Sequence, residues 1–565
     1  MIHLFLLAGL LGSGLSADPV VKVEQGLLLG ALQPGAKGTA SFYSFKGIPY
    51  AAPPLDSLRF KAPRPAIPWS GVRNATVEGS MCMQPTFTGQ VVGSEDCLFV
   101  NVHTPKLTCD SLLPVFVFIH PSAFYFGDGG TGFYGPDFIN YNGVVLVAFN
   151  YRLGPQGFLN LETPGAPGNA GLKDTLAALQ WVQKNIRAFC GDPSKVTVGG
   201  NSAGAMMAHV HALSPKSQGL FQRAALISGN ALTNPCYMDS HLAAARELGG
   251  LLGVSDPASL ESTLRAATGE QLISAFRKMM MTEGHPNLMF KFAMSPEKPS
   301  ASEGDLAGST FLTSSPELLV RQHKVSPVPI LTGNTAQESA SMFHLGVISE
   351  VINGSEAAML ARVNKRFPEI LQREALLIPE DIAKLLGVSR GAGGANQQEA
   401  LLKLVRSEYA GGRTTLSRDE YISIVSGMVY VGPLLNYLRL CRDGEVYLYE
   451  TDSVSSYNLL TRGLFQVPYA TTTAHVDDLG WLFRPYSVPI QQDYHGEGLD
   501  SALLRTFTTL VTDFIKGKAV GTPAVCRESS LPFIHINGSQ PVADTDYFQG
   551  KSRLWERVWD LRRKQ

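Results

Sequence analysis

The sequence is poor in cysteine and has no excess of charge of either sign. Its 565 residues include seven cysteines, 47 lysines and arginines and 48 aspartates and glutamates, which give a formal net charge of −1. This balance gives no reason to expect nucleic acid or an anionic membrane surface as a partner. Cysteines this sparse do not define a disulfide scaffold. The fold must therefore rest on a hydrophobic core, for which 44% apolar residues and this length are ample.

Long hydrophobic runs are also lacking beyond the N-terminal segment. Residues 2–15 are apolar but too short to span a membrane, and small residues follow them. We interpret residues 1–17 as a secretory signal peptide cut near Ala17, in preference to a buried N-terminal strand, because no turn signals bound the run. No later run looks long enough to cross a membrane, and the C-terminal RLWERVWDLRRKQ is too charged for an anchor. We expect residues 18–565 to form a single secreted, extracellular domain with no membrane span.

Export has consequences for two residue types. Asn-x-Ser/Thr sites of an exported chain can carry glycans, and three are expected here, at Asn74, Asn353 and Asn537. Disulfides can form in the same compartment, and the odd number of cysteines leaves at least one thiol unpaired within the chain.

Continuous apolar or β-branched runs predict strands buried on both faces. Between them, GLKDTLAALQWVQKNIRAF has apolar residues at spacings of three and four, which is typical of a helix. The following CGDPSK is expected to end that helix through Gly191 and Pro193. Alternating strands and helices predict an α/β fold with a large, mostly parallel central sheet, helices on both faces and helical insertions. The expected strands are Val115–Ile119, Val144–Phe149, Lys195–Val198, Ala224–Ser228, Val446–Glu450 and Phe533–Ile536.

The motif G-x-S-x-G occurs as GNSAG around Ser202. The pattern alone is weak, because a chain this rich in glycine and serine can produce it by chance. Its context is more specific, since a short β-branched strand precedes it and helix-forming residues follow from Ala203. A strand, a turn and a helix around this motif form a nucleophile elbow, in which glycines avoid collisions and the serine backbone is strained.

A serine nucleophile needs a base, and the base needs an orienting acid, in the chain order Ser, acid, His for this fold. Six histidines follow residue 280, and His209 and His211 stand closer to Ser202. Spacing alone does not choose among them. No zinc-ligand spacing accompanies the pair of His209 and His211, so we expect no metal and no cofactor.

Several longer stretches are together far more specific than this motif: FKGIPYA (45–51), LRF (58–60), SEDCLFVNV (94–102), NYRLGPQGFL (150–159), APGNAGLKD (166–174), LQWVQKNI (179–186) and FCGDPSKVTV (189–198). With them the chain resembles the type-B carboxylesterases, in the carboxylesterase and cholinesterase family of α/β-hydrolases. The similarity covers nearly all of the chain after residue 17, and the form HVDDL is most like insect esterases.

The resemblance implies a catalytic triad. The nucleophile falls on Ser202. The acid falls on Glu338, within GNTAQES, and the base falls on His475, within AHVDDLGWLF. Without the resemblance, Glu338 reads as a solvated loop carboxylate and His475 as a loop histidine that caps the next helix. The agreement of all three positions, in the order Ser, Glu, His, favours the triad.

The same resemblance implies structural features. A disulfide is expected between Cys82 and Cys97, and the pairing of the other five cysteines stays open. Two structural ion pairs are also implied, Arg59 with Glu95 and Arg152 with Asp174.

The chain departs from the family at the expected oxyanion hole. The resembled enzymes carry His-Gly-Gly-Gly after a core strand, where this chain has HPSAF at 120–124. The backbone N–H groups of Ser122, Ala123 and Ala203 are expected to bind the oxyanion. Pro121 has no N–H, but that position is not expected to donate. Two interpretations stay open, a working hole with altered selectivity or a hole weakened by backbone strain.

A second departure concerns the substrate. The neutral Asn201 stands where the resembled enzymes often have Glu, and no Trp lies between Cys82 and Cys97, so we expect no preference for choline esters. The expected function is a secreted serine esterase that acts on lipophilic small-molecule esters through an acyl-enzyme. The alternative is a non-catalytic or weakly active binding or adhesion protein of the same fold with a degenerate oxyanion hole. The sequence does not indicate the oligomeric state.

Overall fold

The computed structural model of the chain describes residues 18–547. Its gaps are 87, 234–235, 283–290, 299–309, 323–327, 342, 344–359, 362–363, 365–402, 404–406, 408–410, 412, 414, 442–443, 467–471, 528–530 and 546. The expected signal segment 1–17 and the expected glycan site Asn353 lie outside the described residues.

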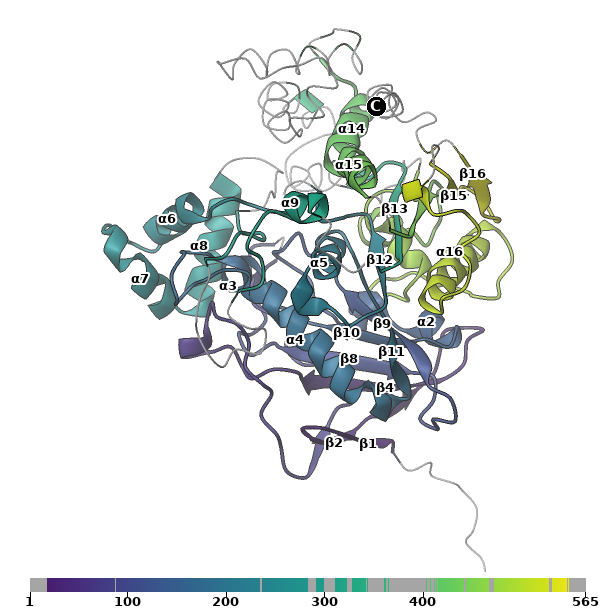
Figure 1. Cartoon of the computed structure of the whole chain (residues 1–565), viewed down its shortest axis with the longest axis horizontal. Helices are drawn as coiled ribbons and strands as arrows, with labels where there is room; N and C mark the ends of the chain where they lie inside the picture. The colour runs from purple at the N-terminus through teal and green to yellow at the C-terminus, as the bar shows by residue number, and fades with distance from the viewer. Residues whose placement is uncertain are drawn as a thin grey trace, which may run out of the picture.

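The described residues are arranged around one mixed sheet of 11 strands (Figure 1). Its central strands, from β15 across to β10, all run parallel, and antiparallel strands extend both edges. The expected α/β class with a mostly parallel sheet is therefore confirmed. In spatial order the strands are β16 (Val542–Asp544), β15 (Phe533–Ile536), β14 (Val446–Thr451), β13 (Ile330–Thr335), β12 (Arg223–Ile227), β11 (Gly191–Asn201), β9 (Leu113–Ile119), β10 (Val145–Phe149), β8 (Phe99–Thr104), β4 (Phe42–Pro49) and β3 (Ala31–Gln33).

Smaller sheets and the helices surround this core. Figure 1 shows α6, α7 and α8 grouped on one flank and α16 on the other. The small sheets contain β1 (Val20–Val23), β2 (Gly26–Leu29) and β5 (Val72–Asn74), and β6 (Gln84–Pro85) with β7 (Val91–Val92). The α-helices are α1 (Thr131–Tyr134), α2 (Asp137–Tyr141), α3 (Gly154–Phe158), α4 (Ala170–Asn185), α5 (Ala203–Ala212), α6 (Leu242–Leu251), α7 (Leu260–Ala266), α8 (Gly269–Thr282), α9 (Pro316–Arg321), α14 (Arg418–Ser426), α15 (Gly432–Leu440) and α16 (Leu499–Ile515).

Both faces of the sheet are buried, which explains the continuous apolar strands. Alternate residues of β9 enter different cores: Val117 belongs to the same cluster as the stripe of α4, whereas Phe118 belongs to the cluster that contains Phe507 of α16. A strand covered on both sides has no face for polar residues, so its sequence does not alternate.

All six expected strands are present, but β13 was missed. Its sequence ILTGNT is interrupted by glycine and polar residues, although every residue of it is buried. A Cβ at Gly333 would collide with the ring and backbone of Tyr449 on the neighbouring strand. This glycine is therefore a packing requirement of the sheet rather than a turn signal.

The end of the long helix differs from the expectation. Residues 170–185 form α4 and 186–189 continue as a 3-10 turn, but the left-handed residue that follows is Cys190, with φ of 60°, and not Gly191. Cys190 forms a disulfide with Cys109. A left-handed residue at the end of a helix is usually glycine, whereas here it is a disulfide-bonded cysteine. Gly191 instead opens β11.

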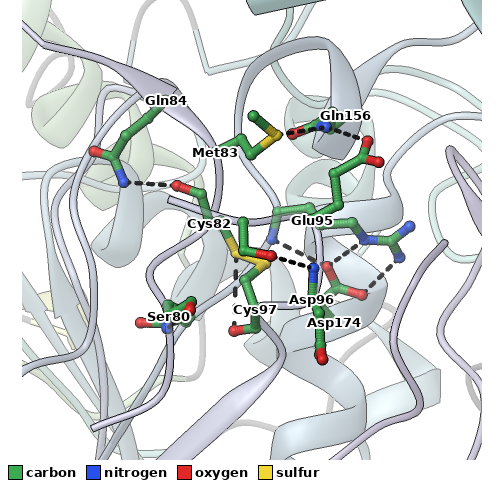
Figure 2. The surroundings of a disulfide bond; sticks show 12 residues. Ser80, Cys82, Met83, Gln84, Glu95, Asp96, Cys97, Gln156 and Asp174 are labelled. Carbon is green, nitrogen blue, oxygen red and sulfur yellow. Dashed lines mark hydrogen bonds and ion pairs between the residues drawn. A yellow bond between two sulfur atoms is a disulfide. The ribbon is translucent and has the colours of Figure 1, made fainter. Parts of the chain in front are cut away.

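The expected disulfide between Cys82 and Cys97 is present, and Figure 2 shows its surroundings, including Glu95 and Asp174. Both implied ion pairs also form: Arg59 lies 2.6 Å from Glu95 and Arg152 lies 2.7 Å from Asp174, with side chains mostly or wholly buried. Further disulfides join Cys109 to Cys190 and Cys441 to Cys526, which leaves Cys236 as the buried free thiol.

One helical stretch contradicts the expectation that no later run is long and apolar enough to cross a membrane. Residues Arg418–Leu440, which comprise α14, a π-helical segment (Gly427–Val431) and α15, reach a mean hydropathy of 1.3. However, 89% of that apolar window is buried inside the protein. Its composition is therefore that of a core helix.

Candidate active site

Ser202 occupies a sharp bend between β11 and α5. Its backbone is strained, with φ of 56° and ψ of −125°. A Cβ at Gly200 or Gly204 would collide with the Ile119 carbonyl oxygen. The bend therefore requires both glycines of GNSAG, and the local geometry is that of a nucleophile elbow.

The acid and the histidine form a direct pair. Glu338 follows β13, and its Oε2 lies 2.6 Å from His475 Nδ1. Its other oxygen, Oε1, accepts the Thr335 N–H at 2.7 Å. The His475 N–H also donates to the Glu338 carbonyl oxygen at 3.1 Å, so the two segments are joined by backbone as well as side chain. Glu338 is fully buried, which strengthens a charge-assisted hydrogen bond.

Ser202 and Glu338 lie at the same edge of the sheet, since Ser202 directly follows β11 and Glu338 follows shortly after the end of the parallel strand β13. His475 is held there by its hydrogen bonds to Glu338. Ser202 and His475 are only 8% and 7% exposed. Among the described contacts no hydrogen bond joins Ser202 to His475. The structure thus confirms the proximity of the acid to the histidine, whereas the link from the serine to the histidine stays a prediction.

The apolar helix described above forms part of this site. The ring of Tyr430, in its π-helical segment, lies 4.9 Å from the ring of His475. The Ser426 hydroxyl accepts the Ser339 N–H next to Glu338 at 2.9 Å. A π-helical turn of this kind is often found at functional sites. The sequence alone indicates no role for this helix, because its apolar residues do not show what they pack against.

Two further acids stand next to His475. Asp477 accepts N–H groups of Leu460, Thr461 and Ala474, and burial raises its pKa to about 6. Asp478 is fully buried, and neither of its oxygens has a hydrogen-bond partner among the described residues. Burial raises the pKa of Asp478 far above its ordinary value, and repulsion from Glu338 adds to the rise. The surroundings of Asp478 therefore favour its protonated form.

The expected oxyanion loop, 120–124, lies beside the elbow, since a Cβ at Gly204 would also approach the His120 carbonyl oxygen at 2.9 Å. Ala123 and Phe124 have positive φ values, 46° and 65°. The backbone N–H groups of Ser122 and Ala123 have no partner among the described hydrogen bonds. The loop therefore keeps two amides available for a ligand, at the cost of left-handed backbone at non-glycine residues.

The other residues that the sequence singled out lie outside the contact between Glu338 and His475. His211 contacts Thr175 and Ser217 through its two ring nitrogens, whereas His209 Nδ1 accepts the Ala231 N–H, so the two rings serve different neighbours. No cluster of three metal-ligating side chains occurs in the part of the chain that the structure describes. Asn201 is wholly buried, and its side-chain amide has no partner among the described residues. The glycan sites Asn74 and Asn537 are exposed.

A family model described as "Carboxylesterase family" matches residues 17–540. The chain belongs to the carboxylesterase family. Its relatives include a juvenile hormone esterase of Tribolium castaneum, 29% identical over 96% of this chain and 93% of the relative. Esterase FE4 of Myzus persicae is 38% identical over 61% of this chain, and the match spans only 60% of that esterase. These relatives confirm the resemblance to insect esterases.

Solved structures agree with this carboxylesterase assignment. A juvenile hormone esterase from Manduca sexta, with OTFP covalently attached, superposes with a TM-score of 0.78 at 26% identity, covering 96% of this chain and all of that one. A structure of a PNB esterase gives a TM-score of 0.71 at 25% identity over 96% of this chain and 99% of that one. The expected α/β-hydrolase fold is thereby confirmed.

Proposed function

We propose that this carboxylesterase chain is a serine hydrolase that cleaves carboxylic esters through an acyl-enzyme, with Ser202 as nucleophile, His475 as base and Glu338 as orienting acid. The observation that carries this proposal is the buried hydrogen bond of 2.6 Å between Glu338 and His475, at the sheet edge where Ser202 occupies its strained bend.

The proposed mechanism follows from proton positions. Glu338 Oε2 accepts a hydrogen bond from His475 Nδ1–H and so keeps the ring proton on Nδ1. Nε2 is then unprotonated and able to take the Ser202 proton as Ser202 Oγ attacks the ester carbonyl. The His475 cation then gives this proton to the departing alcohol, and water repeats the sequence on the acyl-enzyme. Contacts between serine and histidine are often long in unliganded enzymes and tighten with substrate, so the missing hydrogen bond is compatible with this role.

The amides of Ser122, Ala123 and Ala203 are proposed to bind the developing oxyanion. Each such donor contributes roughly 3–4 kcal/mol of transition-state stabilisation. Lipophilic esters are the proposed substrates. The relatives named above include juvenile hormone esterases, and Tyr430 belongs to a buried apolar cluster with Val425 and Val429. The neutral Asn201 supports no preference for a cationic ester.

We also infer that the chain is a single secreted domain, cut near Ala17 and glycosylated at exposed sequons. The three disulfides support an oxidising destination. We propose glycans at the exposed residues Asn74 and Asn537. A glycan at Asn353 is proposed from the sequence alone.

One experiment distinguishes the proposed hydrolase from the alternative, a non-catalytic binding protein of the same fold. Wild type and Ser202→Ala are assayed with an aryl ester, and wild type is treated with an organophosphate before peptide mass spectrometry. We expect Ser202→Ala to lose essentially all activity and the adduct to lie on Ser202. Equal background rates from both proteins, with no adduct on Ser202, would establish the alternative.

A further inference from the structure

The loop 120–124 adopts a conformation that its residues do not favour. Ala123 and Phe124 are consecutive left-handed residues, with φ of 46° and 65°. This conformation costs an L-residue about 1–2 kcal/mol. The loop therefore needs a stabilising contact that outweighs this cost.

The Ser122 side chain supplies such a contact. Its Oγ accepts the Phe124 N–H at 2.8 Å, a hydrogen bond that spans the left-handed Ala123. The same oxygen lies 2.6 Å from Tyr151 Oη, which is also 3.0 Å from the His120 carbonyl oxygen. Ser122 is 1% exposed and Tyr151 is fully buried, so water does not compete for these groups.

The hydrogen bonds of this cluster converge on the Ser122 hydroxyl oxygen. The single hydroxyl proton of Tyr151 lies within reach of both Ser122 Oγ and the His120 carbonyl oxygen. Ser122 Oγ therefore accepts from the Tyr151 hydroxyl and from the Phe124 N–H. The ring of His120 stacks on that of Tyr151 at 4.4 Å, which adds packing to the same contact.

The remaining carbonyl groups of the loop are held by internal donors. His120 Nδ1 lies 3.1 Å from the Pro121 carbonyl oxygen, and burial lowers the pKa of this histidine to about 4, so it is neutral with its Nδ1 proton toward that oxygen. The Ser122 carbonyl oxygen accepts N–H groups of Tyr125 and Phe126 at 2.8 and 3.1 Å. In a trans peptide the N–H points opposite to the C=O. The Ser122 and Ala123 amides therefore face away from these internal partners.

We propose that Ser122 is a positioning residue whose hydroxyl, held by Tyr151, keeps the 120–124 loop in the conformation that presents the Ser122 and Ala123 amides to an oxyanion. The His-Gly-Gly-Gly stretch of the resembled enzymes has glycines here, which need no such support and offer no side chain to supply it. The inference rests on the proposed function, and it identifies HPSAF as a working oxyanion loop rather than a degenerate one.

The test compares Ser122→Ala and Tyr151→Phe with wild type, using steady-state hydrolysis of an aryl ester and the affinity for a trifluoromethyl ketone. Such a ketone forms a hemiketal with a serine and carries an oxyanion there. We expect each variant to lower kcat about 10- to 100-fold with little change in KM, because the oxyanion contact forms in the transition state. The ketone affinity should weaken by the same factor.

A matched control and a rescue variant separate positioning from general stability. Ser217 is also a buried hydroxyl, 2.7 Å from His211 Nδ1, so Ser217→Ala should lower Tm without changing kcat. Adding Ala123→Gly to Ser122→Ala should restore much of the kcat, since glycine removes the cost of the left-handed backbone.

The results that would overturn the positioning role of Ser122 differ from those that would overturn the proposed function. Wild-type kcat and ketone affinity in folded Ser122→Ala, with activity still dependent on Ser202, would overturn this inference alone. Activity that survives Ser202→Ala would overturn the proposed function. If Ser122→Ala does not fold, Tyr151→Phe decides by the same criteria.

Discussion

Glu338 Oε2 lies 2.6 Å from His475 Nδ1, although the two residues are 137 positions apart in the chain. The other carboxylate oxygen is occupied by the Thr335 N–H. Both carboxylate oxygens of Glu338 therefore accept hydrogen bonds, and this geometry places a ring proton of His475 on Nδ1. A neutral residue at position 338 would change this tautomer without removing the contact.

Glu338→Gln is the sharpest test of that relationship. The new amide would keep its oxygen on the Thr335 N–H and turn its NH2 group toward His475 Nδ1, which must then accept. The ring proton would move to Nε2, where it blocks removal of the Ser202 proton. We expect kcat to fall by about 10³- to 10⁴-fold with KM little changed, as judged by steady-state ester hydrolysis. A variant with near wild-type kcat would exclude Glu338 as the orienting acid.

Asp478→Asn should behave in the opposite way. Burial raises the pKa of Asp478 and so favours its protonated form, and an amide of the same shape should therefore change kcat by less than about threefold at neutral pH. Because the folded pKa lies above the unfolded one, the stability from its bound proton is full below the unfolded pKa and is lost as pH rises through the folded pKa. As pH rises above about 4, the Tm of wild type should therefore fall more than that of Asp478→Asn. Equal slopes would contradict a raised pKa of Asp478.

Buried histidines predict loss of stability in acid. Burial lowers the pKa of His209 to about 3, whereas the unfolded chain binds this proton near pH 6.5. Stability is full above that unfolded pKa and is lost as pH falls toward the folded one, by about 2 kcal/mol at pH 5 for one such residue. His209→Gln keeps an acceptor for the Ala231 N–H but does not titrate. We expect its unfolding free energy from denaturant titration to depend less on pH below about 6.5 than that of wild type.

Cys236 should be chemically inert in the folded protein. All seven cysteines lie in described residues, and the other six form three disulfides. Burial raises the pKa of the Cys236 thiol to about 12, and its Sγ–H donates to the Ala231 carbonyl oxygen. Iodoacetamide should modify no cysteine under native conditions and one after denaturation, by intact mass. Alkylation of the native protein at Cys236 would contradict this burial.

Prediction from the sequence was strongest where the relevant forces are local. Runs such as VFVFI and the stripe in 172–189 report burial directly, because residues next to one another along a strand or helix share the same surroundings. GNSAG was equally readable because the motif and the strand and helix around it are contiguous in the sequence, although its glycines avoid the Ile119 carbonyl oxygen on a neighbouring strand. β13 escaped detection because the reason for Gly333 is the ring of Tyr449, on a strand more than a hundred residues later.

The sequence by itself determined the sheet-forming runs, the elbow and, through resemblance, the candidates Glu338 and His475. Only the tertiary structure decided that these two side chains touch, which of the remaining cysteines pair, that Asp478 is buried without a hydrogen-bond partner among the described residues and that Ser122 and Tyr151 contact each other in the 120–124 loop. The physical reason is distance along the chain: hydrogen bonds, desolvation and disulfides act between atoms a few ångströms apart, and the residues that meet here are brought together only by the folded sheet.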